Sequence, residues 1–85
     1  MDLHLKDKKV FISGSTKGIG FETARLFLEE GATVIINGRT KNSVESALKL
    51  LNNDNVSGLV GDFIDESQVK NLIDQIPNDI DILVN

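Results

Sequence analysis

The sequence contains no cysteine, tyrosine or tryptophan, and only one histidine. The absence of cysteine excludes a disulfide framework, a thiolate metal site and a cysteine nucleophile. One histidine, His4, cannot form a histidine metal cluster, so we expect no metal site. No apolar run approaches the about 18 residues that a membrane helix needs, and residues 1–9 lack the apolar core of a secretory signal. We therefore expect a cytoplasmic protein that binds no membrane.

The chain has 85 residues and a formal net charge of −4, which argues against a general nucleic-acid binder. The charge is unevenly distributed, because residues 1–50 carry a net charge of +2 and residues 51–85 a net charge of −6. The basic half also holds most of the glycines, and that combination suits a phosphate site. For most of these charges, a solvated helix face is the simpler explanation.

Short apolar segments alternate with amphipathic ones along the whole chain. Residues 10–12, 33–36, 56–60 and 80–84 are rich in Val and Ile and predict strands. Residues 19–30, 44–51 and 66–76 have apolar side chains at helical spacing and predict helices. We expect Gly31 to end the first helix, Asn42 or Ser43 to cap the second, and Asp65 to cap the third before Pro77. The third helix should bury Val69, Leu72, Ile73 and Ile76.

This β-α-β-α-β-α-β order predicts an α/β fold with a parallel sheet, right-handed crossovers and helices on both faces. We expect the strand order 3-2-1-4, which is the first, incomplete part of a doubly wound, Rossmann-like nucleotide-binding sheet.

A glycine-rich loop joins the first predicted strand to the first predicted helix, with the pattern G-x-x-x-G-x-G over residues 14–20. Glycine allows the backbone N–H groups to approach a ligand, and the start of a helix offers unpaired N–H groups and a positive dipole. A pyrophosphate fits such a site. The loop lacks the Gly-Lys-Ser/Thr ending of a P-loop and the G-x-G-x-x-G spacing, so glycines that serve packing remain the alternative.

Three stretches together resemble the short-chain dehydrogenase/reductase family. Residues 13–20, SGSTKGIG, are similar to its T-G-x-x-x-G-I-G signature, with Ser13 keeping the hydroxyl of the usual Thr. Residues 61–63 resemble the segment with an Asp after the third strand, and residues 80–85, IDILVN, resemble the D-I-L-V-N that opens its N-N-A-G motif. The stretches follow the family's order and cover the whole chain.

The resemblance implies that residues 1–85 are the N-terminal part of a single NAD(P)-binding Rossmann domain. The family's catalytic Ser, and the Tyr and Lys of its Y-x-x-x-K motif, lie beyond the N-N-A-G segment, so no catalytic residue is assigned here. We expect the 85-residue chain alone to be inactive and poorly stable. The full-length protein is expected to be a homo-oligomer that acts on a small-molecule carbonyl or alcohol.

The same resemblance implies a set of cofactor-binding residues. They are Gly14, Ser15, Thr16, Lys17, Gly18, Ile19, Gly20, Gly38, Arg39, Asp62, Phe63 and Asn85. Asp62 would accept a hydrogen bond from the adenine amino group, although a turn or helix-capping role explains an aspartate there nearly as well.

The end of the second predicted strand favours NADP over NAD. An NAD-binding protein usually places Asp or Glu here for the ribose 2′-hydroxyl, but this segment reads Asn37-Gly38-Arg39. Glycine would leave room for a 2′-phosphate, and the Arg39 guanidinium could bind it with two hydrogen bonds. In the family, a basic residue just before the second glycine, here Lys17, goes with NADP. The alternative is that both cations are solvated surface charges.

Three functions remain open from the sequence. The first is the cofactor-binding segment of an NADP-dependent short-chain oxidoreductase, which transfers hydride between nicotinamide and a carbonyl or hydroxyl group. The second is a non-catalytic module that binds or senses NADP(H). The third is an inactive truncated fragment.

Overall fold

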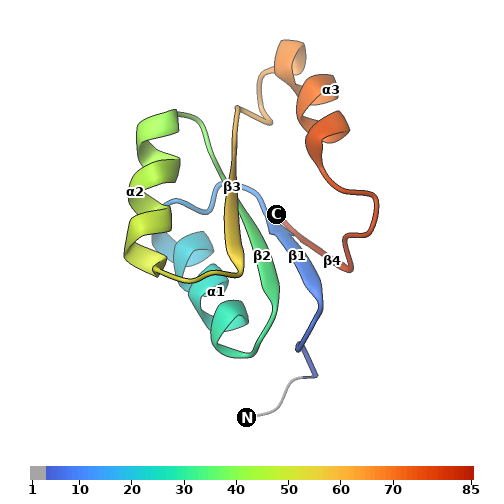
Figure 1. The fold of residues 1–85 in the computed structure, drawn as a ribbon. Helices are drawn as coiled ribbons and strands as arrows, with labels where there is room; N and C mark the ends of the chain where they lie inside the picture. Colours follow the sequence, from blue (N-terminus) through green and yellow to red (C-terminus); the bar gives the residue numbers. More distant parts are fainter. Residues whose placement is uncertain (1–3) are drawn as a thin grey trace.

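The computed structural model describes residues 4–85. Residues 1–3, part of the segment expected to lack a secretory signal, lie outside the described residues. Strands and helices alternate as the sequence predicts (Figure 1). Their bounds are β1 Lys9–Ile12, α1 Gly18–Glu29, β2 Thr33–Gly38, α2 Lys41–Leu51, β3 Val56–Val60, α3 Glu66–Gln75 and β4 Ile82–Val84.

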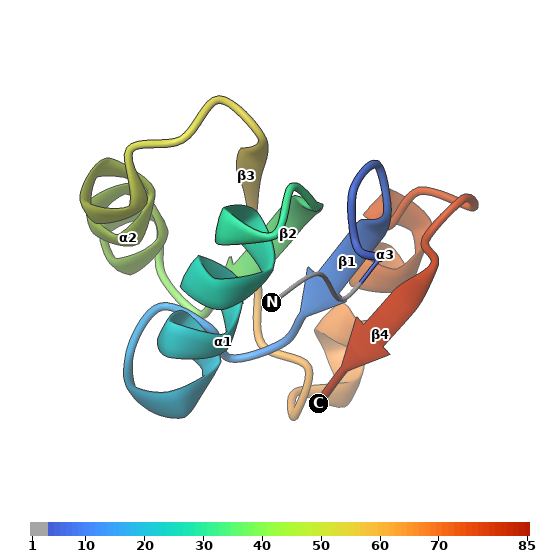
Figure 2. The same cartoon turned by 90° about the horizontal axis from the view of Figure 1, so that it is seen from below.

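The four strands form one parallel sheet in the order β3-β2-β1-β4, which confirms the predicted topology. In the register of this sheet, Val10 of β1 lies between Val34 of β2 and Ile82 of β4. Helices α1 and α2 cover one face, and α3 lies on the other (Figure 2). This arrangement follows from right-handed crossovers, because the chain reverses its direction of travel across the sheet after β3.

The core lies between the sheet and the two helices α1 and α2. Val10, Val34 and Ile36 are completely buried and face Ala24 of α1 and Ala47 of α2 within one cluster. Small residues on the helices let the helix backbones approach the branched side chains of the strands closely. Burying each such Val or Ile contributes roughly 1.5–3 kcal/mol, so this cluster holds the strands whose carboxyl ends carry the candidate site.

Three sequence predictions about the helices and strands differ from the structure. Thr40, and not Asn42 or Ser43, caps α2, because its side chain accepts a hydrogen bond from the backbone N–H of Ser43 at 3.1 Å. Ile73 of α3 is 55% exposed instead of buried, and Val69 and Ile76 are only half-buried, whereas Leu72 is buried as expected.

Strand β4 is also shorter than predicted, because it begins at Ile82 and not at residue 80. The carboxylate of Asp81 accepts a hydrogen bond from the backbone N–H of Lys9 at 2.9 Å. At this position a side chain therefore replaces one of the main-chain hydrogen bonds that would extend the strand. Within residues 4–85, no helix is long and apolar enough to cross a membrane.

Candidate cofactor-binding site

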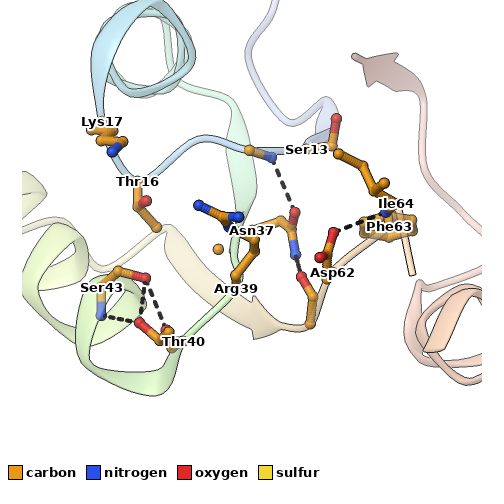
Figure 3. Close-up of a pocket in the computed structure, with 13 residues that line it drawn as sticks. Ser13, Thr16, Lys17, Asn37, Arg39, Thr40, Ser43, Asp62, Phe63 and Ile64 are labelled. Carbon is orange, nitrogen blue, oxygen red and sulfur yellow. Dashed lines mark hydrogen bonds between the residues drawn. The ribbon is translucent and has the colours of Figure 1, made fainter. Parts of the chain in front are cut away.

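A pocket of about 450 Å³ lies at the carboxyl ends of β1, β2 and β3 (Figure 3). Its volume is within the range of small-ligand sites, and ligands of open α/β sheets bind at this edge. Its walls come from the glycine loop, from the end of β2 with the start of α2, and from the segment after β3. The lining residues are Ser13, Gly14, Thr16, Lys17, Asn37, Gly38, Arg39, Thr40, Ser43, Gly61, Asp62, Phe63 and Ile64.

The N-terminus of α1 has no side-chain cap. Lys17 is its N-cap residue and makes no capping hydrogen bond, and the first turn carries no acidic residue. In contrast, Thr40 caps α2 and Asp65 caps α3. The first N–H groups of α1 are therefore left for a partner outside the helix, and the helix dipole makes that partner preferably an anion.

Two glycines of the loop use conformations that other residues rarely adopt. Gly14 has a φ of 54° and Gly18 a φ of 64°. Apart from the two chain neighbours of each glycine and the backbone of α1 itself, no atom lies within 4 Å of the position that a Cβ would take at either residue, so space is open beside both. This open, glycine-lined approach to the start of α1 is what a pyrophosphate group needs.

Gly20 has a different role from Gly14 and Gly18. A Cβ at Gly20 would lie 2.8 Å from the carbonyl oxygen of Gly14 and 3.0 Å from Cα of Ser15. The helix therefore packs directly on the backbone of the loop at this point. Packing, and not direct approach of a ligand, explains the glycine at position 20.

Two cations line the pocket, Lys17 on the glycine loop and Arg39 just after β2. Both are exposed, and neither forms an ion pair with any carboxylate of residues 4–85. The end of β2 contributes no acidic side chain to the pocket. The positive charge on this side is thus available to an anionic ligand.

Gly38 does not leave the free space for a phosphate that the sequence analysis expects, because neighbouring side chains fill it. A Cβ at Gly38 would collide with the Thr16 methyl group and lie 3.0 Å from both Ser43 Oγ and Val44 Cγ2. Gly38 is buried, and its missing side chain is replaced by the side chains of three neighbours. This packing leaves no space for an Asp or Glu side chain at the end of β2.

Asp62 and Phe63 lie across the pocket from Lys17, and Arg39 is seen between them (Figure 3). Oδ1 of Asp62 accepts a hydrogen bond from the backbone N–H of Ile64 at 2.9 Å, which is the geometry of an aspartate turn. The ring of Phe63 packs edge-on against Phe11 with centroids 5.6 Å apart. Both residues therefore have a structural role in addition to any contact with a ligand.

The site residues inferred from the sequence fall into two groups. Those that line the pocket are Gly14, Thr16, Lys17, Gly38, Arg39, Asp62 and Phe63. Those that do not line it are Ser15, Gly18, Ile19, Gly20 and Asn85. Ser15 is fully buried, and its hydroxyl donates to the carbonyl of Ile12 at 2.7 Å, so its side chain holds the loop in place.

Sequence reasoning missed two features of the pocket. Thr40 and Ser43, at the start of α2, add hydroxyl groups beside Arg39 (Figure 3). They could have been found from the rule that ligands bind where parallel strands end. The buried carboxamide of Asn37 was also missed, since its partners are more than 20 residues away in sequence.

The sequence itself also matches a known protein family. The family model for the short chain dehydrogenase matches residues 8–85. The chain belongs to this family. That membership accounts for the glycine loop between β1 and α1 and for the parallel sheet, and it confirms the resemblance seen in the sequence.

Members of the short-chain dehydrogenase family from several bacteria are similar to this chain over its whole length. An uncharacterised oxidoreductase of Bacillus subtilis is 43% identical, and a 3α-hydroxysteroid dehydrogenase of Mediterraneibacter gnavus is 35% identical. The alignments cover 100% of this chain and 34% and 37% of those proteins. The chain thus spans about a third of the length of the relatives it matches.

A solved structure of the family shows the same fold. The L-sorbose reductase of Gluconobacter frateurii, solved with NADPH and L-sorbose, superposes with a TM-score of 0.86 at 27% identity. The superposition covers 100% of this chain and 35% of the reductase. The chain therefore corresponds to one part of a larger short-chain dehydrogenase fold.

Proposed function

We propose that this chain is the N-terminal, cofactor-binding part of an NADP-dependent oxidoreductase of the short-chain dehydrogenase family. The cofactor would supply the hydride that passes to or from a carbonyl or hydroxyl carbon of a small molecule. The observation that carries the proposal is the pair of unpaired cations, Lys17 and Arg39, in the pocket beside the uncapped start of α1.

Each part of the pocket suits one part of the dinucleotide. The first N–H groups of α1, beside Gly14 and Gly18, would bind the pyrophosphate. Arg39 and Lys17 would bind the 2′-phosphate, and a charge-assisted contact of this kind contributes about 1.5–3 kcal/mol. Oδ2 of Asp62 would accept a hydrogen bond from the adenine amino group, because Oδ1 already accepts the Ile64 N–H within the turn.

The residues of this chain bind and orient, and the proton transfer would fall to groups elsewhere in the enzyme. No tyrosine or cysteine occurs in the sequence, and His4 is not among the residues that line the pocket. The family's Tyr-x-x-x-Lys pair would supply the proton donor in the full-length protein. The chain by itself should therefore not turn over a carbonyl substrate.

The activity proposal is tested by sequencing the gene past the codon for Asn85 and assaying the product. An N-A-G continuation, followed by Ser and a Y-x-x-x-K motif, and NADPH-dependent reduction of a panel of ketones and sugars are the expected results. A full-length protein that binds NADPH but lacks both the motif and the activity would instead support a non-catalytic NADP(H)-sensing module.

A further inference from the structure

The side chain of Asn37, near the end of β2, connects two walls of the pocket. Only 4% of this residue is exposed. Its Oδ1 accepts the backbone N–H of Gly14 at 3.0 Å, and its Nδ2 donates to the carbonyl oxygens of Leu59 at 3.0 Å and Gly61 at 3.1 Å. One acceptor meets an N–H and two donors meet carbonyls, so the partners themselves determine the orientation of the amide.

Two of the three backbone groups that the Asn37 carboxamide binds belong to glycines, which have no side chain to hold them. Gly14 opens the glycine loop, and Gly61 immediately precedes Asp62 on the opposite wall. Gly14 has a φ of 54° and Gly61 a φ of 158°, so both adopt backbone conformations that other residues rarely adopt. An external hydrogen bond is therefore an effective way to fix the position of each wall.

A separate set of bonds anchors the loop to the backbone of β2. The Asn37 N–H donates to Ser15 Oγ at 2.9 Å, and the Ser15 N–H donates to the Asn37 carbonyl at 2.8 Å. These contacts use the main chain of residue 37 and do not need its carboxamide. On the other wall, the Gly61 N–H donates to the Gly38 carbonyl at 2.9 Å. Changing the Asn37 side chain thus removes the side-chain link between the walls and leaves the main-chain anchor of each wall in place.

We propose that Asn37 is a positioning residue, whose carboxamide sets the spacing between the glycine loop and the end of β3 and thereby the affinity for the dinucleotide. The inference rests on the proposed function, because it assumes that NADP occupies this pocket. A ligand that spans both walls benefits when their spacing is fixed before binding, since less order must be gained in the complex. Asn37 acts on the ligand through the backbone of Gly14 and Gly61.

The first test compares Asn37→Ala with Val34→Ala in the full-length protein. Val34 is a completely buried residue at the other end of β2, so its truncation also lowers the thermal midpoint without touching the pocket. Calorimetric titration with NADP⁺ should show an affinity at least about tenfold weaker for Asn37→Ala and less than about twofold weaker for Val34→Ala.

Two results of this titration would contradict the account in different ways. If the unaltered protein binds NADP⁺ and Asn37→Ala binds it equally well, the positioning role of Asn37 is wrong and the proposed function stands. If the unaltered protein has no affinity for NADP⁺, the proposed function fails, and the inference about Asn37 fails with it.

A second variant, Asn37→Asp, has a readout that a purely structural role would not move. Its carboxylate keeps the acceptor for the Gly14 N–H but turns an oxygen toward the carbonyls of Leu59 and Gly61. Protonation restores one O–H donor. The affinity for NADP⁺ relative to the unaltered protein should therefore rise at least about fivefold from pH 8 to pH 5.5.

The pH series has internal controls. The other charged groups that face the pocket, Lys17, Arg39 and Asp62, are the same in both proteins, so they cancel in the ratio, as does the cofactor phosphate. For Asn71→Asp, on the exposed side of α3, the affinity for NADP⁺ relative to the unaltered protein should not change with pH. A flat ratio for Asn37→Asp as well would overturn the inference, and this series decides the matter if Asn37→Ala does not fold.

Discussion

The methyl group of Thr16 fills the space into which a side chain at Gly38 would project. Ser43 Oγ and Val44 Cγ2 complete the enclosure, each 3.0 Å from the position of the absent Cβ. The glycine loop and the end of β2 are therefore packed as a pair. An acidic residue, which an NAD site usually has at the end of this strand, cannot be introduced here unless Thr16 gives way.

Gly38→Asp should lower the free energy of unfolding by about 1–3 kcal/mol, because it overfills this packed space. Adding Thr16→Ala should recover part of that loss, with a coupling of about 0.5–3 kcal/mol between the two sites. Urea unfolding of the unaltered protein, both single variants and the double variant measures the coupling. Strictly additive changes would show that Thr16 and Gly38 are energetically independent.

The glycines at positions 18 and 20 should respond differently to substitution. Gly18→Ala places a Cβ in open space, so its cost is the left-handed backbone alone, about 1–2 kcal/mol, and Gly18→Asn should cost less. Gly20→Ala pushes a Cβ against the backbone of Gly14, so it should displace the loop and weaken NADPH binding more than Gly18→Ala does. Fluorescence titration and urea unfolding of each variant provide the comparison, and equal binding losses would contradict this assignment.

The acid stability of α3 should depend on Asp65, its N-cap residue. Hydrogen bonds from the Ser67 hydroxyl, the Gln68 amide and the Ser67 N–H lower the pKa of Asp65 below its usual 3.8. A lowered pKa in the folded state means that the contribution to stability is complete above the unfolded value and is lost as pH falls through the folded value. Asp65→Asn should therefore be less stable than the unaltered protein at pH 5.

That difference should shrink as the pH falls below about 3.8, because the carboxylate of the unfolded chain then takes up a proton that the folded carboxylate, with its lowered pKa, still resists. Urea midpoints measured from pH 5 to pH 2.5 follow it, and Glu66→Gln, one residue further into the exposed first turn of α3, is the control. A gap between Asp65→Asn and the unaltered protein that stays constant with pH would argue against this capping role.

Most of the fold could be predicted because local patterns and topology agree. Continuous β-branched strands such as residues 33–36 alternate with amphipathic helices, and right-handed crossovers leave few sheet orders open. The local errors have local causes. Thr40 is missed as a cap because two other capping residues follow it. The predicted β4 is too long because the hydrogen bond from the Lys9 N–H to the Asp81 carboxylate leaves no trace in the hydrophobic periodicity.

The pocket was predicted in outline, since Lys17 and Arg39 do lie on it. Its internal connections were not predictable, because they join residues that are distant in sequence. The Thr16 methyl beside Gly38 and the Asn37 carboxamide between Gly14 and Gly61 exist only after the strands have paired. Sequence patterns identify which segments meet at the carboxyl edge of the sheet, and packing decides which side chains fill the space between them.

The proposed preference for NADP is tested most directly by replacing Arg39. Dissociation constants for NADPH and NADH should be measured for the unaltered full-length protein, for Arg39→Ala, and for Arg25→Ala as the control. Arg25 is the other arginine of the chain and pairs with Glu22 and Glu29 on the exposed side of α1. Its removal should leave both constants unchanged.

For Arg39→Ala, the dissociation constant for NADPH should rise about ten- to a hundredfold, while that for NADH stays within about twofold, because only NADPH carries the 2′-phosphate. An equal change for both cofactors, or tighter binding of NADH than of NADPH by the unaltered protein, would contradict the proposal.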